Sequence, residues 1–157
     1  MRWMLAGCLT ALMWVASLAL GGEDFRSEEL CRKLQRLVGA AGANFHAASH
    51  TTGRYILPGA ASCDMSLAPG GARSHDCLWS FGYRDAKAAE AFDAMLASAG
   101  ACFPGGAFVG DQSVNHPDFY DLQTLAVDGV EIKISLKDKA ALQKTLVFLR
   151  VVGRPSR

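Results

Sequence analysis

A short polar stretch after residue 114 carries the side chains best suited to catalysis. Asn115 and His116 are followed by Asp118, Tyr120 and Asp121. A histidine beside carboxylates can act as a general base, because nearby negative charge raises the pKa of its imidazole. One hypothesis is therefore a hydrolase that uses His116 with Asp118 or Asp121. No G-x-S-x-G turn accompanies these residues to supply a nucleophile.

The same stretch also has the composition of a recognition loop. Asn, Pro and Asp are common turn formers, and a fixed surface loop is a frequent binding element. We therefore prefer binding to catalysis here. We expect Asn115, His116, Asp118 and Tyr120 to contribute to a binding surface.

Two histidines four residues apart offer a metal-binding hypothesis. On a helix, His46 and His50 would share one face at a spacing that metal ions accept, and a bound ion could assist a hydrolase. The residues between them lack the glutamate that a metalloprotease helix requires. We expect two solvated histidines, no metal and no cofactor.

A run of alternating aromatic residues gives a further binding candidate. Trp79, Phe81 and Tyr83 would share one face of a strand over residues 77–83. Such a face can anchor a partner protein, although packing against helices is the simpler explanation, above all for Phe81. Trp79 is the member that we expect to bind, because amphipathic aromatic residues often lie at the margin of a sheet.

Charge and glycine spacing argue against two large classes of partner. The chain has 16 Lys and Arg against 15 Asp and Glu, a formal net charge of +1, and no block of like charge. Binding to a phosphate backbone needs a concentrated positive surface, so nucleic acid is not an expected partner. Neither Gly70-Gly71 nor Gly105-Gly106 fits a phosphate-binding loop, so no nucleotide is expected.

The N-terminal residues predict export. Residues 3–20 are uncharged and largely apolar, follow Arg2, and end in small residues. These features are typical of a secretory signal peptide, and Ala19 and Gly21 suit cleavage after Gly21. We expect residues 1–21 to be a signal peptide that contacts the membrane only transiently. Residues 22–157 would form one periplasmic or secreted domain.

The N-terminal residues also allow two alternatives to cleavage at this position. The apolar run just reaches the length of a membrane-spanning helix, so a retained anchor would make the chain a membrane-anchored envelope assembly factor. Leu5-Ala6-Gly7-Cys8 matches a lipoprotein cleavage box, but it leaves too few residues for an apolar leader.

The four cysteines beyond the predicted leader also indicate an oxidising compartment. Cys31, Cys63, Cys77 and Cys102 form an even set that predicts two disulfides. Of the three pairings, we favour Cys63–Cys77 and Cys31–Cys102. Their spacing does not match the closely spaced cysteine pairs of zinc sites.

Two helices and several strands must position these residues. Apolar residues at helical spacing predict one helix over 28–41 and another that Asp85 caps and Gly100 ends. Short strands are predicted at 54–57 and 77–83. Residues 104–110 are expected to form an extended loop because of their glycines and proline.

The clearest local signal is a hairpin. Asp128-Gly129 supplies two positive φ angles for a type I′ turn, so Val127 should face Val130 and Leu125 should face Ile132. A turn at 137–139 and a central apolar strand over 145–152 complete the chain.

This order of elements predicts an α+β fold. We expect an antiparallel sheet of about five strands with two helices packed on one face, stabilised by two disulfides. The corresponding function is that of a small exported binding protein that acts on another envelope protein, for example as an inhibitor or immunity-type protein.

Overall fold

The computed structural model describes residues 25, 28–46, 55–67, 71–115 and 118–154. In chain order its elements are α1 (Glu28–Gly42), β1 (Ser62–Leu67), β2 (Arg73–Gly82), α2 (Ala86–Cys102), β3 (Ala107–Asn115), β4 (Phe119–Val127), β5 (Val130–Lys139), the short 3-10 helix η3 (Ala140–Leu142) and β6 (Lys144–Val152).

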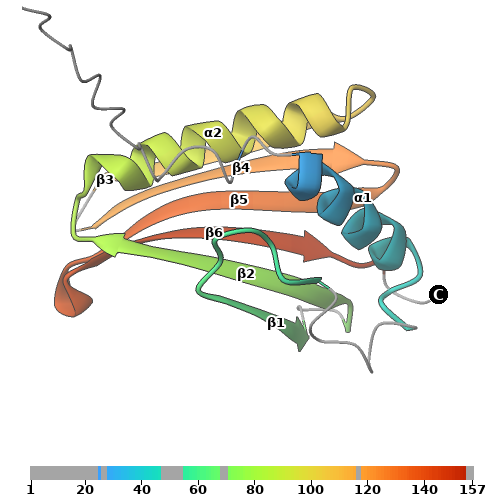
Figure 1. The fold of residues 1–157 in the computed structure, drawn as a ribbon, viewed down its shortest axis with the longest axis horizontal. Coiled ribbons are helices and arrows are strands. Elements are labelled where there is room, and N and C mark those ends of the chain that lie inside the picture. Colours follow the sequence, from blue (N-terminus) through green and yellow to red (C-terminus); the bar gives the residue numbers. More distant parts are fainter. Residues whose placement is uncertain (1–24, 26–27, 47–54, 68–70, 116–117, 155–157) are drawn as a thin grey trace, which may run out of the picture.

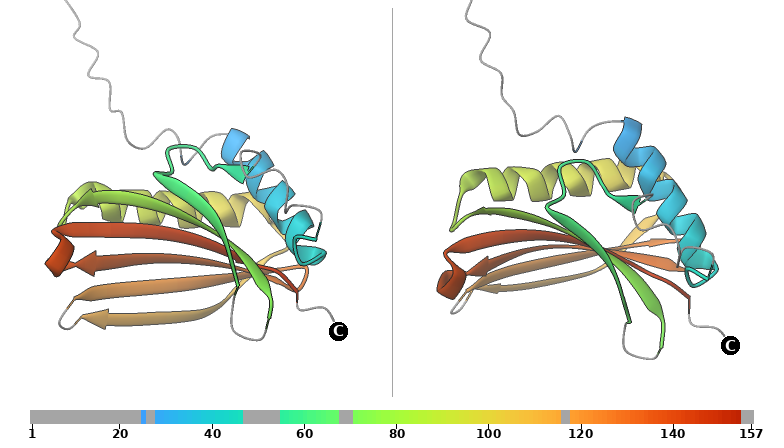
Figure 2. Two further views of the ribbon diagram at one scale, coloured as in Figure 1. Left: turned by 90° about the horizontal axis from the view of Figure 1, so that it is seen from below. Right: turned by 60° about the horizontal axis from the view of Figure 1, so that its bottom comes forward.

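The strands form one antiparallel sheet in the order β1-β2-β6-β5-β4-β3 (Figure 1). Both helices lie over the same face of this sheet, and no described element covers the opposite face (Figure 2). The predicted α+β class is confirmed. The expectation of about five strands was one strand short.

The helices form where the apolar spacing predicts them. The residues of α1 that face the sheet are buried, among them Leu30, Leu34 and Leu37. Helix α2 begins after Asp85, whose side chain accepts a hydrogen bond from the backbone N–H of Lys87 at 3.0 Å. This bond satisfies one of the amide groups left free at the start of a helix. Both helices pack on buried residues of β2, β5 and β6 to form the core.

The hairpin of β4 and β5 has the predicted register. Val127 faces Val130 and Leu125 faces Ile132. Asp128 and Gly129 both have positive φ angles, 49° and 74°. Strand β6 occupies the predicted central position, between β2 and β5.

Three local predictions were wrong. The first strand lies at 62–67 rather than 54–57, and part of the expected loop at 104–110 belongs to β3. Both β1 and β3 are edge strands, and β3 is exposed along its whole length, so neither needs the apolar alternation that reveals a half-buried strand. The expected turn at 137–139 is instead the end of β5, where Asp138 is buried.

Two disulfides join the cysteines in the favoured pairs. Cys31–Cys102 connects α1 to the end of α2, and Cys63–Cys77 connects β1 to β2. Two such bonds indicate an oxidising, extracytoplasmic environment. The predicted signal peptide lies outside the described residues. Within the part of the chain that is described, no helix is both long and apolar enough to span a membrane.

Candidate functional site

The face of the sheet opposite the helices, here called the open face, is the most prominent candidate for a site. Side chains alternate between the two faces of a strand, so the pairing register identifies its members. Those that line a hollow on this face are Ser62 and Asp64 of β1, Asp76 and Leu78 of β2, Phe148 and Arg150 of β6, Lys133, Ser135, Lys137 and Lys139 of β5, and Tyr120 and Leu122 of β4.

These side chains form rows across the sheet. The central row is largely apolar: Leu78 lies opposite Phe148, Phe148 opposite Ser135, and Ser135 opposite Leu122. The three apolar members are only half-buried, although they lie in the middle of a six-stranded sheet. They are therefore apolar surface without an intramolecular cover among the described residues.

A charged row flanks this apolar row on one side, and a mixed row with a single cation flanks it on the other. On one side Asp64, Asp76, Arg150 and Lys133 follow one another across four strands. On the other side Lys137 faces Tyr120, with its Nζ 5.4 Å from the ring centroid. The rows enclose a hollow of about 690 Å³, which is within the size range of ligand pockets.

The acidic part of the open face is fixed by internal bonds. The carboxylate of Asp76 accepts hydrogen bonds from the Arg150 guanidinium and from the hydroxyl of Ser66, which also lies 2.8 Å from the Ser74 hydroxyl. Since its partners already satisfy it, this carboxylate is suited to holding the surface rigid.

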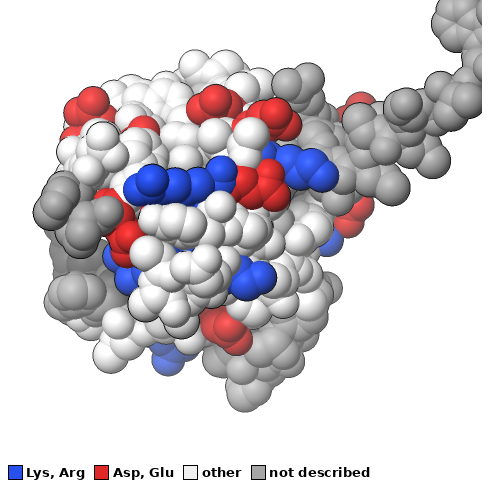
Figure 3. Space-filling model, turned by 90° about the vertical axis from the view of Figure 1, so that its left-hand side faces the viewer, with Lys and Arg blue, Asp and Glu red and all other residues white. Residues whose placement is uncertain are grey.

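The lysines of the open face differ in whether they make an ion pair. Lys133 pairs with Glu131 at 2.9 Å, whereas neither Lys137 nor Lys139 has an acidic side chain within salt-bridge distance among the described residues. The open face therefore presents two cations without an acidic partner in the described part of the chain, Lys137 beside the apolar row and Lys139 one row further away. At the η3 end of the molecule, by contrast, positive and negative side chains are interspersed (Figure 3).

The predicted recognition stretch lies at the β3–β4 end of the sheet. Tyr120 is on the open face and lines the hollow, and exposed Asn115 ends β3. Asp118 accepts a long 3.4 Å hydrogen bond from the backbone N–H of Ala140, which is a structural role. Asp121 lies on the opposite face of β4 from Tyr120, so the structure does not bring it to the hollow. His116 lies outside the described residues.

The other sequence candidates do not join this site. Trp79 is only 3% exposed, packs beside Phe25 and donates a hydrogen bond to the carbonyl of Pro58 at 3.1 Å. Trp79 is therefore part of the core and cannot contact a partner, contrary to the prediction. His46 is exposed at the turn after α1, and His50 lies outside the described residues.

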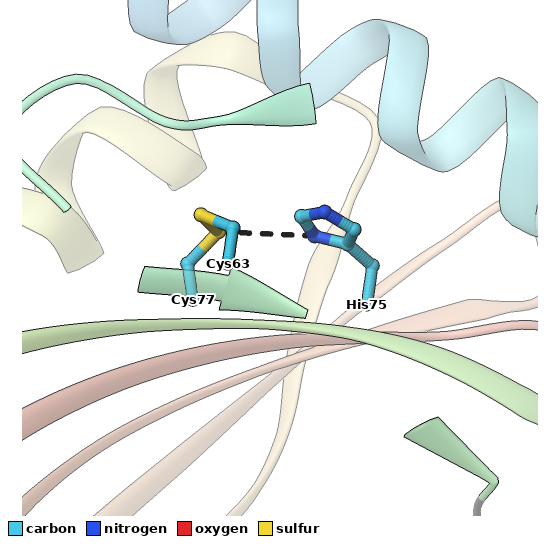
Figure 4. Close-up of side chains that lie close together, drawn as sticks. All are labelled: Cys63, His75 and Cys77. Carbon is cyan, nitrogen blue, oxygen red and sulfur yellow. Dashed lines mark hydrogen bonds between the residues drawn. A yellow bond between two sulfur atoms is a disulfide. The ribbon is translucent and has the colours of Figure 1, made fainter. Parts of the chain in front are cut away.

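A second group of reactive side chains lies on the helix-covered face. The buried imidazole of His75 points toward the Cys63–Cys77 disulfide, with its Nδ1 3.7 Å from Sγ of Cys77 (Figure 4). Burial lowers the pKa of His75 below its ordinary value of 6.5, while the negative charges of Asp76 and Asp64 act in the opposite direction. The imidazole is thus held in its neutral form, which is the form that binds metals.

No protein-family model and no curated protein sequence shows a significant match to this chain.

Sequence reasoning missed most of the open face. The alternation of the predicted hairpin implies that Lys133 and Lys137 face away from Ile132, but it does not show what lies beside them, because strand order is a long-range property. One signal was present. Strand β6 carries Leu146 and Phe148 on the side opposite its buried residues, which indicates that neither of its faces is fully exposed to solvent.

Proposed function

We propose that this chain is an exported, disulfide-stabilised binding protein that holds another protein of the cell envelope on its open face. An inhibitor or immunity-type protein would act in this way. The observation that carries the proposal is the half-buried apolar row Leu78–Phe148–Leu122 at the bottom of a hollow with charged sides.

The residues of the hollow define the chemistry of the partner. An apolar side chain that protrudes from the partner would complete the burial of the central row, which stabilises association by roughly 25 cal/mol for each Å² of apolar surface removed from water. An acidic group beside it would pair with Lys137 and Lys139, which have no acidic partner of their own among the described residues.

The arrangement favours binding over catalysis. Asp76 is bonded to Arg150, Ser66 and Ser74, and Asp118 is bonded to the backbone of Ala140. These contacts hold the surface in one conformation. A rigid surface loses little entropy on association, which is the advantage of a small, cross-linked scaffold in a binding role.

The proposal can be tested by affinity capture from an envelope extract with three versions of the chain. Leu122→Lys places a charge on the apolar row, while Leu142→Lys places the same charge on η3, where the side chain is 63% exposed. The wild type and Leu142→Lys should retain the same stoichiometric protein partner, and Leu122→Lys should lose it without a loss of folded structure by circular dichroism. Equal capture of that partner by all three would overturn the proposal.

A further inference from the structure

Four residues with soft donor atoms share the helix-covered face of the β1–β2 hairpin. Cys63 lies directly opposite Cys77. Met65, two residues after Cys63, lies directly opposite His75, which is two residues before Cys77. Because alternate residues of a strand point to the same side, the two sulfurs of the Cys63–Cys77 disulfide, one thioether and one imidazole are gathered on a patch two residue pairs long.

The donor atoms are close enough to surround one metal ion. Both Sγ atoms and a ring nitrogen of His75 lie within 4.8 Å of one another. Metal–sulfur bonds of about 2.3 Å and metal–nitrogen bonds of about 2.0 Å place neighbouring donors roughly 3.5–4 Å apart. The separation of Cys77 Sγ from His75 Nδ1, 3.7 Å, already matches this spacing (Figure 4).

The surroundings of the cluster are dry and aromatic. Cys77 is fully buried, His75 is 3% exposed, and the rings of Phe45 and Tyr55 lie 6.5 Å and 5.9 Å from the imidazole. Cys63 is partly exposed on edge strand β1, which gives a metal ion a route of entry. Sulfur donors in an apolar pocket select soft ions, and the thioether favours copper(I) over zinc.

We propose that reduction of the Cys63–Cys77 disulfide converts this cluster into a copper(I) site. A dithiol reductant transfers two electrons and two protons to the bond, forms its own disulfide and leaves two thiols. Copper(I) then displaces the two thiol protons and is bound by both thiolates and the His75 imidazole, with Met65 as the neighbouring thioether. The Cys63–Cys77 disulfide thus controls metal binding, because the oxidised protein has no thiolate at this site.

The fold allows the disulfide to open without loss of the hairpin. Strand β1 pairs with β2 over six residue pairs, and β2 is paired along its other edge with β6. The second disulfide, Cys31–Cys102, joins the two helices and is not part of the cluster. This site lies on the opposite side of the sheet from the open face, so the proposal does not depend on the proposed binding function.

The test is an anaerobic titration of the purified chain with copper(I) in competition with a coloured copper(I) chelator. The chain should bind one ion after treatment with a dithiol and none when oxidised. After the same reduction, the variant Cys31→Ser with Cys102→Ser should bind like the reduced wild type, and Cys63→Ser with Cys77→Ser should not bind. Met65→Leu, which keeps the side-chain volume, should weaken binding roughly tenfold, a loss typical of altered metal surroundings.

Three results would overturn the proposal. They are equal binding by the oxidised and reduced chains, binding that survives in Cys63→Ser with Cys77→Ser, and a reduced chain that binds zinc(II) but not copper(I). Circular dichroism of each variant separates loss of the site from loss of the fold, and Met65→Leu remains informative if a cysteine variant is unstable. X-ray absorption of the loaded protein should show sulfur and nitrogen neighbours.

Discussion

Asp138 is a buried carboxylate that connects three elements at one end of the sheet. It accepts hydrogen bonds from the Thr145 hydroxyl at 2.6 Å and from Nε of Arg84 at 3.2 Å. The same hydroxyl oxygen accepts a bond from the Arg84 backbone N–H, a residue with a positive φ of 54°. The network thus fixes the turn from β2 to α2 against β5 and β6.

Replacement of Asp138 by Ala should lower the free energy of unfolding by about 1–3 kcal/mol, because it leaves buried polar groups without partners. Asp138→Asn, which keeps an acceptor oxygen, should cost less. Urea unfolding measures both values. Asp93→Ala on the exposed side of α2 is the matched control, and a loss no larger than that of the control would contradict the structural role of Asp138.

At His75, burial makes stability depend on pH. The folded chain disfavours the protonated imidazole, whereas the unfolded chain takes up a proton as the pH falls below about 6.5. The negative charges of Asp76 and Asp64 raise the pKa of His75, but they do not cancel the effect of burial.

The free energy of unfolding should therefore be full at about pH 7.5 and decrease as the pH falls through 6.5 to about 5.5, with a smaller decrease in His75→Gln. Urea unfolding of the oxidised chain at both pH values measures the slope, and exposed His46→Gln should keep the wild-type slope. A wild-type slope in His75→Gln would show that another group is responsible.

At the scale of elements, the β4–β5 hairpin depends on its turn. Gly129 has a φ of 74°, a conformation that side chains with a Cβ rarely adopt, and an added Cβ would lie 2.8 Å from the Arg154 guanidinium. Gly129→Ala should therefore destabilise the protein by roughly 1 kcal/mol.

Gly105→Ala is the appropriate comparison, since a Cβ there meets no atom within 4 Å and φ is not positive. Thermal unfolding should show a lower melting temperature for Gly129→Ala alone. Equal melting temperatures for the two variants would mean that the positive φ of the turn carries no cost.

The elements with strong local signals were predictable, and the edge strands were not. Helix α1, helix α2 and the hairpin each carry a cap, a period or a turn dipeptide that acts over a few residues. Strands β1 and β3 are held by their neighbours on one side only, so their sequences did not need a buried face. The bulge at Phe108–Gly110 further interrupts the alternation of β3.

At the scale of the whole molecule, the binding surface arises from strand order. Leu78, Phe148 and Leu122 come from distant parts of the sequence. They lie in one row because β6 and β5 are placed between β2 and β4 in the sheet. The sequence allowed three cysteine pairings, and the favoured one is confirmed, although Cys31 and Cys102 are 71 residues apart. It did not predict the hollow, since no local pattern records which strands become neighbours.

Protection of lysines in the complex with the captured envelope partner tests the central claim most directly. Lys137 and Lys139 belong to the open face, and Lys87 is exposed on helix α2, on the other side of the sheet. Acylation followed by mass spectrometry should show that the partner protects Lys137 and Lys139 and leaves Lys87 as reactive as in the free chain. Protection of Lys87 with unchanged labelling of Lys137 and Lys139 would contradict the account.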